Sequence, residues 1–492
     1  MAKFPFQLLI KNASSKNKEE CLTCTTLLRA IPGRREVYDA LWDGRGVVVK
    51  VFSHKISAKR HVKREWRGLS KLAARGLNSP EPLFTGQTED GQWAVVVEKV
   101  ANVSTVLDVL GETMDNAKNL DLLVLVCEEL AKQHNKGVLQ KDLHLGNFLL
   151  GPVRNSTREE SGAPGQEGKI SNGVGGDKVF ALDPGQMRFF SRQIGRKKGI
   201  SQLASLVCYL PASDTKSIAR LCEEYARVRG WRFRRSDEAL FQKQLSVHRK
   251  KGIKRGLKKC LRTSKRHLRI KSGMYLAVFD KSFCQGAEPL DFIEQIDALM
   301  DKGRILKNGN TCYVSGVTWN GKDVVVKRYN HKGFIHSLRH TIKKSRARRG
   351  WLHGHRLGML NIATPKPLAY IERRRGMLVW ESYLVTECVE GQKLYDFLRG
   401  DNVTEQQRSK RVEQIRELLD KLGKYRIAHG DLKHSNILLA ENGAILTDLD
   451  GMKVYRWNWT YMVRRRKELG RFSKRSSCES ILYKSFFEET LE

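Results

Sequence analysis

The sequence has no apolar run long enough to cross a bilayer, which takes roughly 20 residues. Its first residues, Met1 to Pro5, are followed by lysines and lack the apolar segment and the small-residue cleavage site of a secretory signal peptide. We therefore expect a protein that stays in the cytoplasm and does not span a membrane.

The sequence also lacks the grouped cysteines of a disulfide framework. Its ten cysteines are scattered along the chain, as is typical of a protein in a reducing compartment. Only Cys21 and Cys24 form a Cys-x-x-Cys pair, and no second pair follows at a spacing that would complete a zinc site. We do not expect a zinc site from this pattern.

Acidic residues are few compared with basic ones. There are 53 Asp and Glu against 90 Lys and Arg, which gives a net charge of +37. Such a surface attracts polyanions, whether nucleic acid, an anionic membrane or a heavily phosphorylated glycolipid. The composition does not choose among these three partners.

The segment from residue 429 to 439 contains the pattern on which our interpretation depends. Asp431 is followed five residues later by Asn436, and twelve residues after that Asp448 ends an apolar segment. Phosphoryl transfer uses such a set, because one carboxylate orients the attacking hydroxyl while the Asn and the second Asp hold a metal ion. Upstream, an apolar strand delivers Lys327, which is the type of residue that holds phosphate in these sites.

The same four residues occur in the same order in the first half of the chain. They are Lys50, Asp142, Asn147 and Asp183. The Asp-to-Asn spacing is five residues in both halves, and a Pro-x-Pro-Leu turn precedes each loop, at 80–83 and at 365–368. We interpret this as an internal duplication. The alternative is that each Asp-x-x-x-x-Asn is an ordinary loop after a helix.

Four further residues are candidates for nucleotide binding. Glu65 lies in a predicted helix and is the natural ion-pair partner of Lys50, unless it is an exposed helix residue. Glu98 and Glu387 end apolar strands where a nucleotide-binding hinge would lie, and Gly309 belongs to a short phosphate-loop candidate at 308–311. No Gly-rich phosphate loop precedes Lys50.

Two basic segments could contact phosphate or a membrane. Residues 249–271 contain twelve Lys or Arg and no acid, with apolar residues near helical spacing. They predict either a basic amphipathic helix on a membrane or the last helix of the first domain with a solvated basic face. Near the C-terminus, Trp457 and Trp459 precede the basic residues 464–467, although Trp is more often a core residue.

With these residues identified, both halves resemble the lipopolysaccharide core kinase family. In the second half the resemblance rests on residues 345–351, 362–368, 429–436 and 446–450, and in the first half on 64–66, 80–82 and 142–147. It covers roughly 35–245 and 300–475. The family consists of bacterial enzymes that are related in fold to protein kinases and that phosphorylate heptose or Kdo sugars of the lipopolysaccharide inner core.

The resemblance implies an α+β fold with two tandem protein-kinase-like domains, each with a small β-rich N-lobe and a helical C-lobe. We expect a flexible lead-in at 1–28, a first domain at 29–271 with an insertion at 152–177 and a basic end at 249–271, and a second domain at 272–492.

The resemblance also implies ATP with Mg²⁺ as the phosphate donor and a sugar of the lipopolysaccharide core or lipid A precursor as the acceptor, at the cytoplasmic face of the inner membrane. By position, Lys327 would hold the ATP phosphates, Asp431 would act as base, and Asn436 and Asp448 would hold the metal. The matching residues of the first half would do the same.

The first half departs from the family pattern at two points. Gln140 stands where the loop usually has His, and the turn after Asp183 is Pro-Gly. Two working sites is our leading interpretation, and one degenerate half is the competing one.

The second half departs at the helix. Counted back from the Pro-x-Pro turn, Gly350 occupies the position that matches Glu65. Lys327 therefore either pairs with another acid, such as Glu372, or has no such ion pair.

Two other functions remain open. An atypical protein kinase of the Rio type has a similar His-x-Asp-Leu loop, and a pseudokinase scaffold would bind phosphoglycolipid without catalysis. We do not expect a nucleic-acid partner, because no RNA-binding module is recognisable. The sequence does not indicate the oligomeric state.

Overall fold

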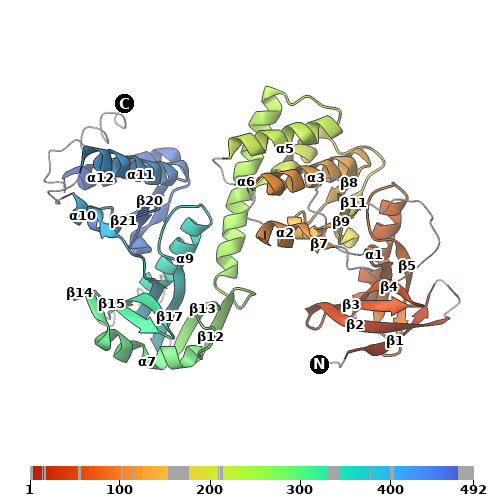
Figure 1. Cartoon of the computed structure of the whole chain (residues 1–492), viewed down its shortest axis with the longest axis horizontal. Helices are drawn as coiled ribbons and strands as arrows, with labels where there is room; N and C mark the ends of the chain where they lie inside the picture. Colours follow the sequence, from red (N-terminus) through yellow and green to blue (C-terminus); the bar gives the residue numbers. More distant parts are fainter. Residues whose placement is uncertain are drawn as a thin grey trace. The chain divides into compact units, whose positions relative to one another are not determined.

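The computed structural model describes residues 4–13, 15, 18–53, 57–100, 103–112, 116–152, 177–208, 210, 214–330, 344–376, 378–398 and 404–474. The chain combines helices and sheets and divides into two compact units, residues 1–250 and 251–492 (Figure 1). The predicted insertion at 152–177 lies, apart from its two end residues, outside the described residues.

The first unit begins with a closed barrel in the order β1-β2-β3-β4-β6-β5. Its strands are β1 (Phe6–Asn12), β2 (Glu19–Ile31), β3 (Arg35–Trp42), β4 (Arg45–Phe52), β5 (Pro82–Thr88) and β6 (Trp93–Glu98). Alternate residues of β4, Val47, Val49 and Val51, are buried in the barrel core, as the two-residue period of a strand dictates. Helix α1 (Ala58–Ala73) packs on the sheet through Val62 and Leu69.

The expectation of a flexible lead-in at residues 1–28 is wrong. β1 and most of β2 lie in this segment and pair with each other in antiparallel fashion. Phe6, Leu8 and Ile10 alternate with outward-facing residues and pack in the barrel core. An alternation this short, surrounded by polar residues, carries little pattern until the partner strands are known.

Helices form most of the rest of the first unit. α3 (Asn116–Asn135), α4 (Arg196–Val207), α5 (Thr215–Val228) and α6 (Arg235–Lys259) surround a core that includes Val126, Leu203 and Phe241. Short elements complete it: β7 (Ser104–Thr105), α2 (Val106–Glu112), β8 (Val138–Gln140), β9 (Phe148–Pro152), β10 (Asp177–Ala181) and β11 (Met187–Phe189).

A seven-stranded sheet in the order β12-β13-β17-β18-β16-β15-β14 opens the second unit. Its strands are β12 (His267–Lys271), β13 (Tyr275–Asp280), β14 (Arg304–Gly309), β15 (Cys312–Trp319), β16 (Lys322–Tyr329), β17 (Pro367–Arg375) and β18 (Leu378–Glu387). Helix α7 (Pro289–Lys302) and helix α9 (Arg346–Gly358) pack on opposite faces. Ala277 and Phe279 of β13 contact the α7 side, whereas Val278 between them joins the cluster of α9.

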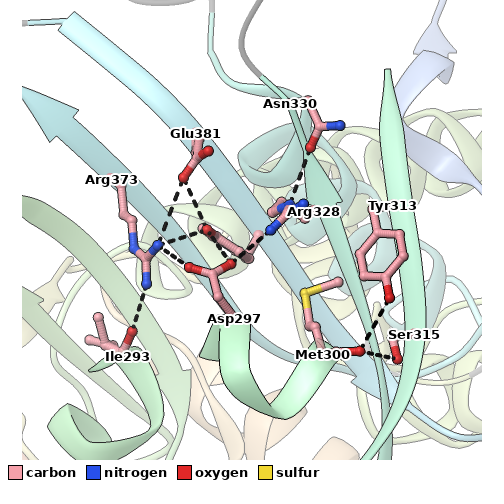
Figure 2. A network of polar contacts seen from close by, with 10 residues as sticks. Ile293, Asp297, Met300, Tyr313, Ser315, Arg328, Asn330, Arg373 and Glu381 are labelled. Atoms are coloured by element: carbon pink, nitrogen blue, oxygen red, sulfur yellow. Dashed lines mark hydrogen bonds and ion pairs between the residues drawn. The ribbon is translucent and has the colours of Figure 1, made fainter. Parts of the chain in front are cut away.

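Asp297 fixes α7 to this sheet (Figure 2). Its carboxylate accepts hydrogen bonds from Arg328 Nη1 at 3.1 Å, from the Tyr383 hydroxyl at 2.9 Å and from Arg373. Burial opposes the ionisation of Asp297, but the hydrogen bonds and the charge of Arg373 outweigh it and lower the pKa of this carboxyl. The helix is thus attached by an ionised network as well as by apolar packing.

The basic segment 249–271 is not one helix. α6 ends at Lys259, and a turn in which Ser264 N donates to His267 O at 2.8 Å leads into β12. β12 pairs with β13, so the sheet of the second unit begins before residue 272. The apolar residues at near-helical spacing therefore belong partly to a helix and partly to a strand, and their spacing alone did not distinguish the two.

The second unit ends in a helical region. α10 (Leu394–Phe397), α11 (Glu405–Lys424) and α12 (Asn458–Lys474) pack around a core that includes Ile415, Leu418 and Leu446. The short strands are β19 (Gln392–Lys393), β20 (Ile427–Ala428), β21 (Ile437–Ala440), β22 (Gly443–Leu446) and β23 (Lys453–Val454). Among the described residues, no helix has both the length and the apolar composition that crossing a bilayer requires.

Candidate active sites

The two candidate lysines occupy the same place in their sheets. In the first unit β4 pairs with β6 so that Lys50 lies opposite Val95 and Val47 lies opposite Glu98. In the second unit β16 pairs with β18 so that Lys327 lies opposite Leu384, and Val324 lies opposite Glu387. Along its strand, each lysine thus lies three residues after the valine that is paired with the candidate hinge glutamate.

The loops that carry Asp142 and Asp431 have the same backbone. In each, a short 3-10 turn ends at the Asn, at Leu145–Asn147 and at His434–Asn436. The Asn side-chain Nδ2 donates to the backbone oxygen of the Asp at 2.8 Å in both units. Because this bond uses the amide nitrogen, the amide oxygen is the atom that can serve as a metal ligand.

Asp183 and Asp448 adopt a left-handed backbone conformation. Their φ angles are 52° and 60°, in a region that non-glycine residues rarely occupy. The residue before each Asp donates its backbone N–H to the loop Asn, Leu182 to Asn147 at 2.8 Å and Thr447 to Asn436 at 2.9 Å. Such local strain persists where the surrounding structure holds it and is common at functional sites.

In the first unit Lys50 pairs with Glu65. Lys50 Nζ lies 2.5 Å from Glu65 Oε1 and 4.0 Å from Asp183 Oδ1. Glu65 is buried, and its other oxygen accepts a hydrogen bond from Gly185 N at 3.2 Å. The helix α1 is therefore tied through one carboxylate to both the lysine strand and the Asp183 turn.

The second unit has a different charge arrangement. Lys327 Nζ lies 2.5 Å from Asp448 Oδ1, so the lysine pairs directly with the candidate metal ligand. Burial opposes the ionisation of Asp448, but the charge and the hydrogen bond of Lys327 lower its pKa. Helix α9 contributes a cation instead of an acid, because Arg346 pairs with Asp450 at 2.6 Å.

Glu372 is not the partner of Lys327. It is buried on β17, where it accepts a hydrogen bond from Ser345 Oγ at 2.7 Å and pairs with Arg374 at 3.3 Å. Its role is to hold the start of α9 against the sheet, because Ser345 is the N-cap of that helix.

The two candidate bases are exposed, and each has a basic residue two positions later in the chain, Lys433 or His144. The side chain of Asp431 is 48% exposed and lies 2.8 Å from Lys433 Nζ. That of Asp142 is 64% exposed and lies 3.8 Å from His144 Nε2. Neither of these two residues was identified from the sequence, although their shared offset from the Asp was a usable pattern.

The departure at Gln140 changes how the first loop is held. In the second unit His429 Nε2 lies 2.8 Å from Thr447 O, and Glu468 of α12 accepts the backbone N–H groups of His429 and Gly430. In the first unit Gln140 instead donates to Gln133 of α3 at 2.8 Å. Glu468 had no local pattern that could have identified it.

The remaining candidates lie at strand ends. Glu98 pairs with Arg45 at 3.3 Å, and Glu387 Oε1 accepts the backbone N–H of Lys366 at 2.8 Å. Gly309 is the last residue of β14 and pairs with Cys312 of β15. Cys312 in turn pairs with Tyr329 of β16, and Tyr329 lies two residues after Lys327. The candidate phosphate loop is thus the turn of the β14–β15 hairpin.

Comparison with known proteins assigns a family model to part of the second unit. Residues 299–478 match the model "Lipopolysaccharide kinase (Kdo/WaaP) family". This match contains Lys327, Asp431, Asn436 and Asp448, and it supports a kinase, that is, a phosphotransferase. A search of curated protein sequences gives no significant match.

Two solved kinase structures are among the similar chains. One is "Structure of vaccinia related kinase 3", with 11% identity and a TM-score of 0.30, covering 51% of this chain and 85% of that one. The other is the PknI kinase domain of Mycobacterium tuberculosis, with 16% identity and a TM-score of 0.25, covering 38% of this chain and 72% of that one. Neither likeness is close enough to support an inference by itself.

Proposed function

We propose that this protein is an ATP-dependent kinase that phosphorylates a heptose or Kdo hydroxyl of the lipopolysaccharide inner core. The observation that carries the proposal is the arrangement of Lys327, Asp431, Asn436 and Asp448 within a segment that matches the lipopolysaccharide kinase model. Positioning and electrostatic stabilisation supply most of the catalysis in phosphoryl transfer, and these are the residue types that provide both.

We also propose that the two units are tandem copies of one protein-kinase-like domain. The pairings of the lysine strands support this, since both place the hinge glutamate in the same register. The strands that follow the two Pro-x-Pro turns support it as well. In each unit the pairing register shifts just after the second proline of the turn, which is Pro82 in the first unit and Pro367 in the second.

The oxygen donors of each site suit Mg²⁺, which prefers hard carboxylate and carbonyl ligands. Asn436 and Asp448 would hold the ion in the second unit, and Asn147 and Asp183 in the first. A bound Mg²⁺ supplies charge neutralisation for the ATP phosphates. Lys327 would exchange its contact with Asp448 for a phosphate oxygen of ATP, whereas Lys50 would stay oriented by Glu65.

The two exposed aspartates would orient the sugar hydroxyl and accept its proton. Asp431 and Asp142 follow the short strands β20 and β8, and a backbone oxygen of each is held by the Asn of its own loop. Lys433 and His144 lie beside them and would contact the transferred phosphoryl group, where hydrogen-bond donors and the Lys433 ammonium stabilise the charge that develops.

We propose that the protein acts at the anionic cytoplasmic surface of the inner membrane, where its acceptor lies. The net charge of +37 favours such a surface. One face of α12 supports the proposal, because Trp459, Met462 and Val463 are exposed there and are followed by the exposed Arg466 and Lys467. Apolar and basic side chains on one helix face are typical of helices that lie in a membrane interface.

The test is phosphate transfer from labelled ATP to dephosphorylated lipopolysaccharide core, with Asp142→Ala and Asp431→Ala made singly and together. If both units are catalytic, each single variant loses part of the transfer and the double variant loses it all. Asp90→Ala and Glu413→Ala, exposed acids of the two units, are the controls and keep full transfer.

Other outcomes identify the alternatives. Complete loss with one single variant assigns catalysis to that unit alone. Labelling of proteins in place of the sugar overturns the sugar-kinase proposal in favour of a Rio-type protein kinase. Thermal stabilisation by ATP without any transfer indicates a pseudokinase scaffold.

A further inference from the structure

Three residues of the second unit bring together ligand types that bind transition metals. They are Cys260, just after α6, His267, the first residue of β12, and His355 on α9. The Cys260 sulfur and one ring nitrogen of each histidine all lie within 4.8 Å of one another. The three residues are 3%, 5% and 7% exposed. Cys260 and His267 are seven residues apart, but His355 follows 88 residues later, so no local motif contains all three.

Both histidines have a ring nitrogen that needs a partner. Among the described residues, Nε2 of His267 and Nε2 of His355 are buried and have no hydrogen-bond partner. Ser264 Oγ lies 3.5 Å from Nδ1 of His267 and also accepts a hydrogen bond from the backbone N–H of His267 at 3.1 Å. With Nδ1 occupied by the hydroxyl, Nε2 is the nitrogen left to bind a metal, the usual division between the two ring nitrogens.

The surroundings hold the three ligands in place. Trp351, one turn before His355 on α9, donates its indole N–H to the backbone oxygen of Cys260 at 3.0 Å. Its ring packs edge-on against both imidazoles, with centroid separations of 5.6 Å to His267 and 4.3 Å to His355. Aromatic packing explains the positions of the rings, but it leaves both Nε2 atoms unsatisfied.

The nearby charges are mixed. Asp280, the partner of His267 in the β12–β13 ladder, is 2% exposed and pairs with Arg266 at 3.0 Å and with Lys366 at 3.6 Å. Its carboxylate gives the region a fixed negative charge, and the two cations balance it at the outer side. Binding of a divalent ion with loss of the Cys260 proton would add one positive charge, so the Cys260 thiolate is the ligand that limits the charge added to a region where Arg266 and Lys366 already balance Asp280.

We propose that Cys260, His267 and His355 form a zinc site that joins α6, β12 and α9. A thiolate with two imidazoles is a ligand set that Zn²⁺ prefers and Mg²⁺ does not. Tetrahedral zinc with bonds of about 2.0–2.3 Å places its ligand atoms about 3.3–3.7 Å apart, so the side chains close in by roughly an ångström on binding. Three protein ligands leave the fourth position for water.

Zinc binding would fix the position of α9, because His355 belongs to this helix. This helix also carries Arg346, which pairs with Asp450 beside the candidate active site. A bound metal would therefore hold the helix end that lies far from the Arg346 contact and limit its movement against the sheet. The proposed zinc site does not depend on the sugar-kinase proposal.

The test uses the full-length protein stripped with a chelator and titrated with Zn²⁺ alone, followed by Co²⁺ as a spectroscopic probe. The wild type should bind one equivalent of Zn²⁺ and give a thiolate-to-cobalt charge-transfer band. Cys260→Ser should lose the band, and His355→Gln should weaken zinc binding about 100-fold. Zn²⁺ should raise the melting temperature of the wild type more than that of either variant at the same zinc concentration.

Two controls make the result specific. Cys312→Ser alters another buried thiol of the same cluster and should keep the band. Asp448→Asn removes a candidate Mg²⁺ ligand and should also keep it. Binding of no zinc, or a band that survives in Cys260→Ser, overturns the proposal. If Cys260→Ser does not fold, the wild-type cobalt spectrum and His355→Gln still decide the question.

Discussion

At the scale of single residues, the two candidate sites use different acids to hold their lysines. Glu65 is buried beside Lys50, whereas the matching position in the second unit is Gly350 and Lys327 pairs with Asp448. The first site thus keeps its lysine oriented without using the carboxylate proposed to bind the metal. In the second site the lysine occupies one oxygen, Oδ1, of the carboxylate proposed to bind the metal.

Glu65→Gln should therefore impair the first site. The amide keeps the shape but leaves the half-buried Lys50 ammonium without its charge partner, so the lysine turns toward Asp183, 4.0 Å away. Measured in an Asp431→Ala background, kcat/KM for ATP should fall about 10- to 100-fold, or about 1.4–2.8 kcal/mol. Glu81→Gln, an exposed acid of the same unit, is the matched control. Unchanged kcat/KM in Glu65→Gln would show that the ion pair is not needed.

The sequence allowed prediction of the candidate residues but of few of their contacts. Lys, Asp, Asn and Asp stand in short local patterns, so their positions along the chain are enough to propose them as candidates. The contacts of Arg346 with Asp450 and of Glu468 with the His429 backbone join distant segments. No local period carries such pairs, and only the fold brings them together.

At the scale of elements, strands were harder to predict than helices. β1, β2 and β12 are short or bulged and lie in polar or basic segments, and their pairing partners determine them more than their own residues do. α12 shows the opposite problem. The sequence marked its tryptophans and basic residues, but which side the tryptophans face depends on the core that the helix packs against. Trp459 is 71% exposed, so the usual core position of Trp does not apply here.

The exposed face of α12 gives a prediction for membrane binding. Trp459→Ser combined with Val463→Ser should lower partitioning onto vesicles with anionic lipids about 30-fold, because partial burial of each side chain contributes roughly 1 kcal/mol. Co-sedimentation with anionic and with neutral vesicles measures it. Ile305→Ser, which removes an exposed apolar residue on β14, should bind as the wild type does. Equal binding by the double variant would place the membrane contact elsewhere.

At the scale of the whole molecule, the two units have separate cores but share helix α6. Phe241 and Leu245 of α6 lie in the core of the first unit, whereas Cys260, just beyond its end, lies in a cluster of the second. Each unit is large enough to unfold cooperatively by itself. The helix that contains the boundary is the element through which the unfolding of one unit could affect the other.

Asp297→Asn distinguishes independent from coupled unfolding. Asp297 binds Arg328, Arg373 and Tyr383 within the second unit (Figure 2), and losing its charge should destabilise that unit by about 1–3 kcal/mol, since the network is partly solvated. Calorimetry should show two transitions, of which the variant shifts one. The folded pKa of Asp297 is depressed, so its contribution is complete above the unfolded pKa of about 3.9 and is lost as the pH falls through the folded value. The difference in the free energy of unfolding between variant and wild type should therefore be constant near neutrality and should shrink toward zero in acid. A shift of both calorimetric transitions together would mean that α6 couples the two units.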